Sequence, residues 1–130
     1  MSVLLVEDNQ TDVFVIREAL GQCGFPFRLL VQEDGQDALR CLEDLSRRSE
    51  CPNLILLDLN LPKVDGIEVL RRLRQRGLCR RSLVVVVTSS DSQSDRELVQ
   101  SLGAEAYFRK PLDLNEYMKL SQVVRRVLGC

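Results

Sequence analysis

Short apolar segments recur along the chain, and each is followed by a polar turn and a longer stretch in which apolar residues have helical spacing. Five such segments stand at 3–6, 28–32, 54–57, 83–87 and 106–109. Apolar runs that lack alternation with polar residues are typical of parallel strands covered by helices on both faces. The pattern therefore predicts five strands, of which 83–87 is the clearest because its consecutive valines favour a pleated backbone.

A helix is predicted after each strand. Asn9 to Asp12 can cap the first helix, and Gly77 and Gly103 are expected to end the third and fourth. The last helix is expected to run unbroken from about 114 to 128. Strand and helix thus alternate five times within 130 residues, which predicts one doubly wound α/β domain over 1–130, with right-handed crossovers and no output domain.

Composition narrows the class of protein. Hydrophobic residues make up 45% and charged residues 28%, as in a soluble globular domain, and no apolar run approaches the roughly 20 residues that span a bilayer. The first strand begins directly after Met1 with no basic leader, so the cytoplasm is the expected compartment. A net charge of −1 gives no overall attraction to nucleic acid.

The cysteines are odd in number and scattered, and the chain has no histidine. They are Cys23, Cys41, Cys51, Cys79 and Cys130. Such a pattern indicates neither a disulfide framework nor a zinc site, and free thiols are expected. The lack of histidine excludes mechanisms that need an imidazole from this chain.

Polar side chains of particular types stand where four of the predicted strands end. Glu7 and Asp8 follow the first strand, Asp58 the third, Thr88 the fourth and Lys110 the fifth. Parallel strands of one sheet end at the same edge, which is where such sheets bind ligands. The sequence therefore predicts one site built from residues that are far apart in the chain.

The predicted site would bring three carboxylates together with only one cationic side chain, so a further positive charge is needed to offset their repulsion. Carboxylates about 5 Å apart repel by roughly 3 kcal/mol per pair at an effective dielectric constant of about 20. Oxygen ligands without His or Cys select a hard divalent ion, so Mg²⁺ is predicted, with Mn²⁺ as a substitute. Beside that ion Asp58 can attack a phosphoryl group, while the Thr88 hydroxyl and the Lys110 ammonium donate to the phosphoryl oxygens.

These residues in this order, together with the segment Asp58-Leu-Asn-Leu-Pro-Lys-Val-Asp-Gly66, resemble the receiver domain of two-component response regulators. The turn after Glu7 and Asp8 and the Thr-Ser-Ser run at Thr88 are similar to those of single-domain regulators paired with bacterial phytochromes and related sensor kinases. The resemblance implies a flavodoxin-like sheet of order 2-1-3-4-5. It also implies a sensor histidine kinase as phosphoryl donor, and an output by partner binding or by onward transfer in a phosphorelay.

The resemblance assigns metal ligands residue by residue. It implies that Asp8 and Asp58 bind Mg²⁺ through their carboxylates and Asn60 through its backbone carbonyl, with Glu7 close by. Asp58 is the implied phosphoacceptor. The protein would then be a signalling domain that assists only its own phosphorylation and dephosphorylation.

Switching is assigned by the same resemblance. Thr88 corresponds to the switch hydroxyl and Tyr107 to the switch aromatic, while Ser89 is small enough to leave the phosphoryl group accessible. The Lys110–Pro111 peptide is expected to be cis.

Two surface features bear on partners. A wide apolar band follows the predicted last helix, at Leu114, Tyr117, Met118, Leu120, Val123, Val124, Val127 and Leu128. The fourth helix, fifth strand and fifth helix form the usual signalling face of the family, so a downstream partner or a homodimer is expected there. Six arginines between 71 and 81 fit the solvated face and C-terminal end of a helix, and no nucleic acid or membrane partner is expected.

Two other functions fit parts of the pattern. An Mg²⁺-dependent phosphohydrolase also places an aspartyl nucleophile after an apolar strand, but its second acid would stand where this chain has Asn60. An adaptor that keeps the fold without being phosphorylated is the other alternative. Steady hydrolysis of a phosphomonoester would favour the enzyme, and partner binding unaffected by Asp58→Asn would favour the adaptor.

Overall fold

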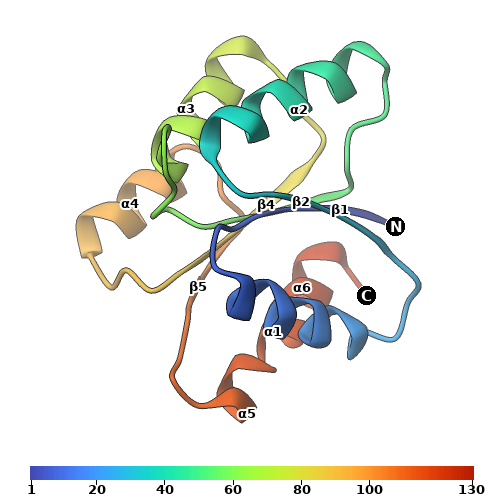
Figure 1. Ribbon diagram of the computed structural model, residues 1–130, viewed down its shortest axis with the longest axis vertical. Coiled ribbons are helices and arrows are strands. Elements are labelled where there is room, and N and C mark those ends of the chain that lie inside the picture. The colour runs from blue at the N-terminus through green and yellow to red at the C-terminus, as the bar shows by residue number, and fades with distance from the viewer.

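The computed structural model describes residues 1–130 and contains five parallel strands in the order β2-β1-β3-β4-β5 (Figure 1). The strands are β1 (Ser2–Val6), β2 (Arg28–Gln32), β3 (Leu54–Leu57), β4 (Leu83–Thr88) and β5 (Ala106–Arg109). All five predicted strands are present, and β3 lies at the centre between β1 and β4. The order confirms the predicted flavodoxin-like fold.

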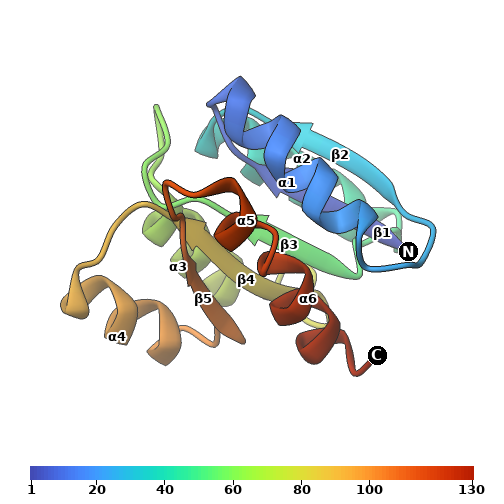
Figure 2. The same cartoon turned by 90° about the horizontal axis from the view of Figure 1, so that it is seen from below.

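Six helices cover the sheet. They are α1 (Gln10–Gly21), α2 (Gly35–Arg47), α3 (Gly66–Arg76), α4 (Gln93–Ser101), α5 (Leu114–Tyr117) and α6 (Leu120–Leu128). Helices α2, α3 and α4 lie on one face, and α1, α5 and α6 lie on the other (Figures 1 and 2). None of these helices is long and apolar enough to cross a membrane.

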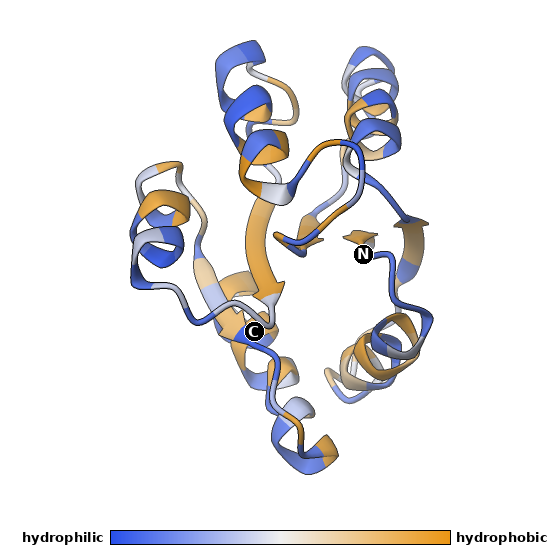
Figure 3. Ribbon diagram, turned by 60° about the vertical axis from the view of Figure 1, so that its left-hand side comes forward, coloured by the Kyte–Doolittle hydropathy of each residue, from blue (hydrophilic) through white to orange (hydrophobic).

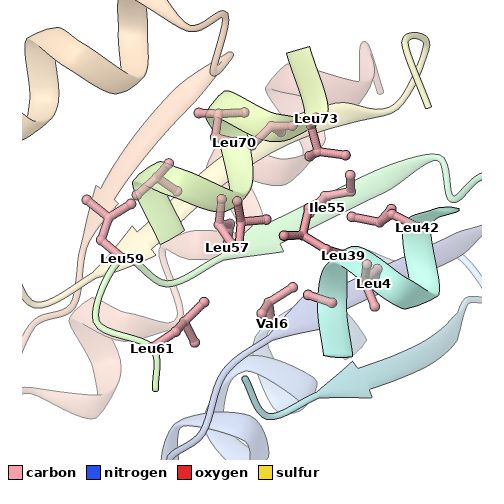
Figure 4. Close-up of a cluster of buried hydrophobic side chains, with 14 of the residues drawn as sticks. Leu4, Val6, Leu39, Leu42, Ile55, Leu57, Leu59, Leu61, Leu70 and Leu73 are labelled. Carbon is pink, nitrogen blue, oxygen red and sulfur yellow. The ribbon is translucent and has the colours of Figure 1, made fainter. Parts of the chain in front are cut away.

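Alternate strand residues feed two hydrophobic clusters, one on each face of the sheet. Leu4, Ile55 and Val84 point toward the α2–α3 side, whereas their neighbours along the strands point toward α1 and α6. Figure 4 shows side chains of the first cluster, and Figure 3 shows that the strands are mostly hydrophobic whereas the helices carry both hydrophobic and hydrophilic stretches. Because β3 is fully buried on both faces, its carboxyl end is held in a fixed position.

The last helix is interrupted, contrary to the expectation of one unbroken helix. The N–H of Lys119 donates to the carbonyl of Glu116, and the N–H of Ser121 donates to that of Met118, both at 3.1 Å. This three-residue spacing tightens the backbone between α5 and α6. The tighter turn allows both Tyr117 (5% exposed) and Leu120 (0%) to be buried.

The peptide bond between Lys110 and Pro111 is trans, as are all others in the structure, so the expected cis bond is not found. Trans is favoured by about 0.5–1 kcal/mol at bonds that precede proline. The chain remains extended up to Lys110, whose N–H donates to the Thr88 carbonyl at 2.8 Å.

Two cysteines form a disulfide, which corrects the expectation of free thiols throughout. Cys51, just before β3, is bonded to Cys79, in the turn between α3 and β4, with a Cα–Cα distance of 5.5 Å. The parallel pairing of β3 with β4 brings the segments before these strands together at the amino edge of the sheet. Cys23, Cys41 and Cys130 remain free thiols.

The arginine-rich stretch is largely engaged within the fold. Arg71 and Arg72 both pair with Glu68. Arg74 donates to the backbone carbonyls of Leu102 and Gly103, tying α3 to the end of α4. Four of the six arginines, including Arg76 on Glu43, thus have partners in the chain itself.

Candidate phosphoacceptor site

Asp58 stands directly after the central strand, at the carboxyl edge of the sheet, in a cluster of charged side chains called the acidic site below (Glu7, Asp8, Asp12, Asp58 and Lys110). Its N–H continues the strand pairing by donating to the Val6 carbonyl at 3.1 Å. Its side chain is only 6% exposed, and Oδ1 accepts a hydrogen bond from the N–H of Asn60 at 3.2 Å. The position that β3 gives this carboxylate is therefore fixed by both backbone and side-chain contacts.

The carboxylates predicted to converge do so. Glu7 is buried (1% exposed) at the end of β1, and Asp8 next to it is exposed. One oxygen from each of Glu7, Asp8 and Asp58 lies within 4.8 Å of the others. Two neighbouring strands thus place three carboxylates around one small volume.

Lys110 supplies the one ammonium group of the acidic site. Its Nζ lies 2.6 Å from Glu7, 3.0 Å from Asp12 and 3.1 Å from Asp58. Its three N–H donors therefore have three carboxylate acceptors, and Asp8 is not among them. With Asp8 included, the acidic site contains four carboxylates and one ammonium group, so it carries an excess of negative charge.

The pKa values of Glu7 and Lys110 in the acidic site follow from their burial and from this charge balance. Burial raises the pKa of Glu7 to about 7, and the charge of Asp58 adds to the increase while Lys110 opposes it. Burial by itself lowers the pKa of Lys110, but its hydrogen bond to Glu7 and the charge of Asp58 outweigh burial and raise the pKa above its usual range. The ammonium therefore remains charged at neutral pH.

The donor set fits a hard divalent ion. Only carboxylate oxygens converge, without histidine or thiolate, and Mg²⁺ and Mn²⁺ prefer such ligands. Asp8 is exposed, so water can reach this member of the cluster. The backbone carbonyl assigned to Asn60 stays a prediction.

The predicted switch residues are linked through the segment that follows β4. Thr88 is fully buried, and its Oγ1 accepts a 3.4 Å hydrogen bond from the N–H of Ser90. The Tyr107 hydroxyl donates to the Ser90 carbonyl at 2.7 Å, and Arg96 lies 4.3 Å from the centre of the Tyr107 ring. Ser89, which lies between Thr88 and Ser90 in the chain, is exposed.

Two residues of the site were not predicted from the sequence. Asp12 in the first turn of α1 accepts from Lys110, and the Tyr117 hydroxyl donates to Asp12 at 3.0 Å. Burial and the nearby Asp12 carboxylate raise the pKa of Tyr117 above its usual range, so its hydroxyl stays protonated. The sequence indicates Asp12 only as a capping residue and Tyr117 only as part of an apolar band, because their contact depends on how α5 packs beside α1.

Gly66 allows α3 to begin directly against the end of β3. A Cβ atom at this position would lie 2.1 Å from the Asp58 carbonyl oxygen and 2.7 Å from the Leu59 Cα. Both contacts are with backbone, which cannot move aside without displacing Asp58. Glycine is therefore required here because the two backbone segments approach so closely.

Gly66→Ala should lower the free energy of unfolding by about 2 kcal/mol, because the added methyl group overpacks the backbone at Asp58. Urea unfolding followed by circular dichroism measures this change. Gly21→Ala is the matched control, since a Cβ there meets no atom within 4 Å and alanine favours the helix. Equal stability of Gly66→Ala and wild type would show that the segment after Asp58 can shift freely.

Comparison with known proteins defines the family. Residues 3–122 match the model of the response regulator receiver domain, and the chain therefore belongs to that family. Among curated proteins, the response regulator Rcp1 of Synechocystis is 37% identical over 122 residues, which cover 92% of this chain and 83% of Rcp1.

Solved structures agree with this assignment. The phosphorylated cyanobacterial phytochrome response regulator RcpA superposes with a TM-score of 0.85 at 32% identity, covering 98% of this chain and 93% of RcpA. The Mn²⁺-bound form of Rcp1 gives a TM-score of 0.82 at 35% identity, covering 95% of this chain and 91% of that one. The chain is thus a response regulator receiver domain with a flavodoxin-like fold and an acidic cluster that could hold a divalent ion.

Proposed function

We propose that this chain is a receiver that takes a phosphoryl group on Asp58 in the presence of Mg²⁺. The observation that carries the proposal is the position of Asp58 at the end of β3, within 4.8 Å of two other acids and 3.1 Å from the Lys110 ammonium. Relatives of similar length are described as phosphorylated in one case and Mn²⁺-bound in another. A cytoplasmic location is part of the proposal.

The phosphoryl group comes from a phosphohistidine on a sensor histidine kinase. An Asp58 carboxylate oxygen bonds to phosphorus while the phosphorus–nitrogen bond of the donor breaks, and the electron pair stays on the imidazole nitrogen. Hydrolysis resets the site: a water oxygen bonds to phosphorus, the bond to Asp58 breaks, and inorganic phosphate leaves with a proton released to solvent. The chain assists these steps on itself and turns over no other substrate.

Several residues support this exchange. Asp8 and Asp58 would hold the divalent ion through carboxylates and Asn60 through its carbonyl, with Glu7 beside them. The ion, when bound, offsets charge on the phosphoryl oxygens. Lys110 donates to the same oxygens with an ammonium that burial and its acidic partners keep charged.

Switching would begin at Thr88. A phosphoryl group on Asp58 offers strong acceptors, which draw the Thr88 hydroxyl toward them and away from the N–H of Ser90. Tyr107 is bonded to the Ser90 carbonyl, so movement of this segment alters the position of Tyr107 beneath Arg96. The altered surface over α4, β5 and the last helices would then bind a downstream protein, a phosphotransfer partner or a second copy of the chain.

The direct test is incubation with acetyl phosphate and Mg²⁺ followed by intact-mass measurement. Wild type should gain one phosphoryl group, whereas Asp58→Asn should gain none because an amide is not a nucleophile toward phosphorus. A chelated sample should also gain none, because the carboxylates then repel the donor. Glu18→Gln, an exposed acid on α1, is the matched control and should react like wild type.

The outcomes separate the rival functions. An adduct that forms without Asp58 or without metal would contradict the proposed chemistry. Steady release of phosphate from phosphomonoesters would favour the phosphohydrolase instead. Absence of an adduct in every sample, with no binding of the phosphoryl mimic beryllofluoride, would favour the adaptor.

A further inference from the structure

A chain of hydrogen bonds links the acidic site to two helices, α1 and α5, on one face of the sheet. Lys110 Nζ donates to Oδ2 of Asp12 at 3.0 Å, and the Tyr117 hydroxyl donates to the other oxygen, Oδ1, also at 3.0 Å. Asp12 lies at the start of α1 and Tyr117 at the end of α5, and the two helices lie side by side (Figure 2). One carboxylate is thus held by donors from two different elements.

Asp12 differs from the other two acids that accept from Lys110. Glu7 and Asp58 belong to the cluster whose oxygens lie within 4.8 Å of one another, and Asp12 lies outside it. A divalent ion would bind oxygens of that cluster, and a phosphoryl group would be bonded to one oxygen of Asp58. The bond from Lys110 to Asp12 is therefore the one that can persist throughout the transfer.

Tyr117 fixes the position of Asp12. Tyr117 is only 5% exposed, and its ring packs against Phe108 with the centroids 5.9 Å apart. A buried aromatic ring has little freedom, so the hydroxyl is directed at Asp12 by the packing of α5. Asp12 in turn has a side chain that is only 23% exposed, which protects both of its hydrogen bonds from water.

We propose that Asp12 and Tyr117 are positioning residues that hold the Lys110 ammonium in place for the phosphoryl group, an inference that rests on the function proposed above. A lysine side chain has many rotamers and loses this freedom when it meets a ligand. Asp12 orients the ammonium in advance, so the freedom is already lost when the phosphoryl group arrives. Neither Asp12 nor Tyr117 needs to touch the phosphoryl group.

The test is the rate of adduct formation with acetyl phosphate at saturating Mg²⁺. Asp12→Asn should slow the reaction about tenfold, the effect of losing one charge-assisted hydrogen bond. Tyr117→Phe keeps the ring and removes only the hydroxyl, so it should slow the reaction about threefold. Glu18→Gln makes the same charge change on an exposed part of α1 and should react at the wild-type rate.

A double-mutant cycle separates positioning from a structural effect. In a Lys110→Met background, Asp12→Asn should cause no further slowing, because its effect acts through Lys110. A wild-type rate for Asp12→Asn, or an equal slowing with and without Lys110, would overturn the inference. Failure of wild type itself to form an adduct would instead count against the proposed function, so the two failures are distinguishable.

Discussion

Lys110→Met is expected to lower the free energy of unfolding by about 3 kcal/mol when divalent ions are chelated, because it leaves buried carboxylates without a positive partner. The lysine side chain is 10% exposed, and its ammonium donates to three carboxylates at 2.6–3.1 Å. Methionine preserves most of the side-chain length, so packing changes little. Urea unfolding followed by circular dichroism, in the presence of a chelator, measures the loss.

Millimolar Mg²⁺ should restore much of that stability. In the variant the divalent ion takes over the neutralising role of the ammonium, and an ion that binds the folded state raises the free energy of unfolding by mass action. The increase caused by Mg²⁺ should therefore be larger in Lys110→Met than in wild type. The same unfolding experiment, repeated with Mg²⁺ in place of the chelator, measures it.

Lys119→Met is the matched control for both measurements. Lys119 is exposed and pairs with Glu116 on the surface, so its loss should change stability by less than about 1 kcal/mol. If Lys110→Met were as stable as this control in the presence of the chelator, the view that Lys110 offsets the charge of the buried carboxylates would be contradicted. An Mg²⁺ effect no larger than in wild type would also contradict it.

Much of the fold could be predicted because each strand carries its own local signal. The run from Leu54 to Leu57 has no polar residue, and such a strand can be buried only between two layers of helices. Parallel pairing then brings the ends of β1, β3 and β5 to one edge, so Glu7, Asp58 and Lys110 meet although they are distant in sequence. Position at a strand end is information that the sequence carries directly.

What could not be predicted depends on how helices and turns pack. Asp12 enters the site from a helix, and its contact with Tyr117 requires the break after α5, which no proline or glycine marks. Periodicity alone favours an unbroken helix there, because apolar residues continue at helical spacing. The pairing of Cys51 with Cys79 likewise depends on the length and direction of α3, which returns the chain to the amino edge.

The Cys51–Cys79 disulfide leads to a second large effect: its reduction should lower the free energy of unfolding by about 3–4 kcal/mol. The bond closes a loop with a sequence separation of 28, and a closed loop of this length removes about 3.5 kcal/mol of chain entropy from the unfolded state. Urea unfolding of wild type with and without dithiothreitol measures the change. A paired variant, Cys51→Ala with Cys79→Ala, should have the stability of the reduced protein and should not respond to dithiothreitol.

The location of the disulfide predicts that it does not affect the rate of adduct formation. Both cysteines precede their strands, β3 and β4, and so lie at the amino edge, whereas Asp58 and Lys110 lie at the carboxyl edge. Reduction should therefore leave the rate of adduct formation by acetyl phosphate within about twofold of the oxidised protein, provided that the domain remains folded. Cys130→Ser, which alters an exposed free thiol, should change neither stability nor rate. Unchanged stability of wild type after complete reduction would show that the bond does not constrain the unfolded chain, and a large change in rate would show that the two edges of the sheet are coupled.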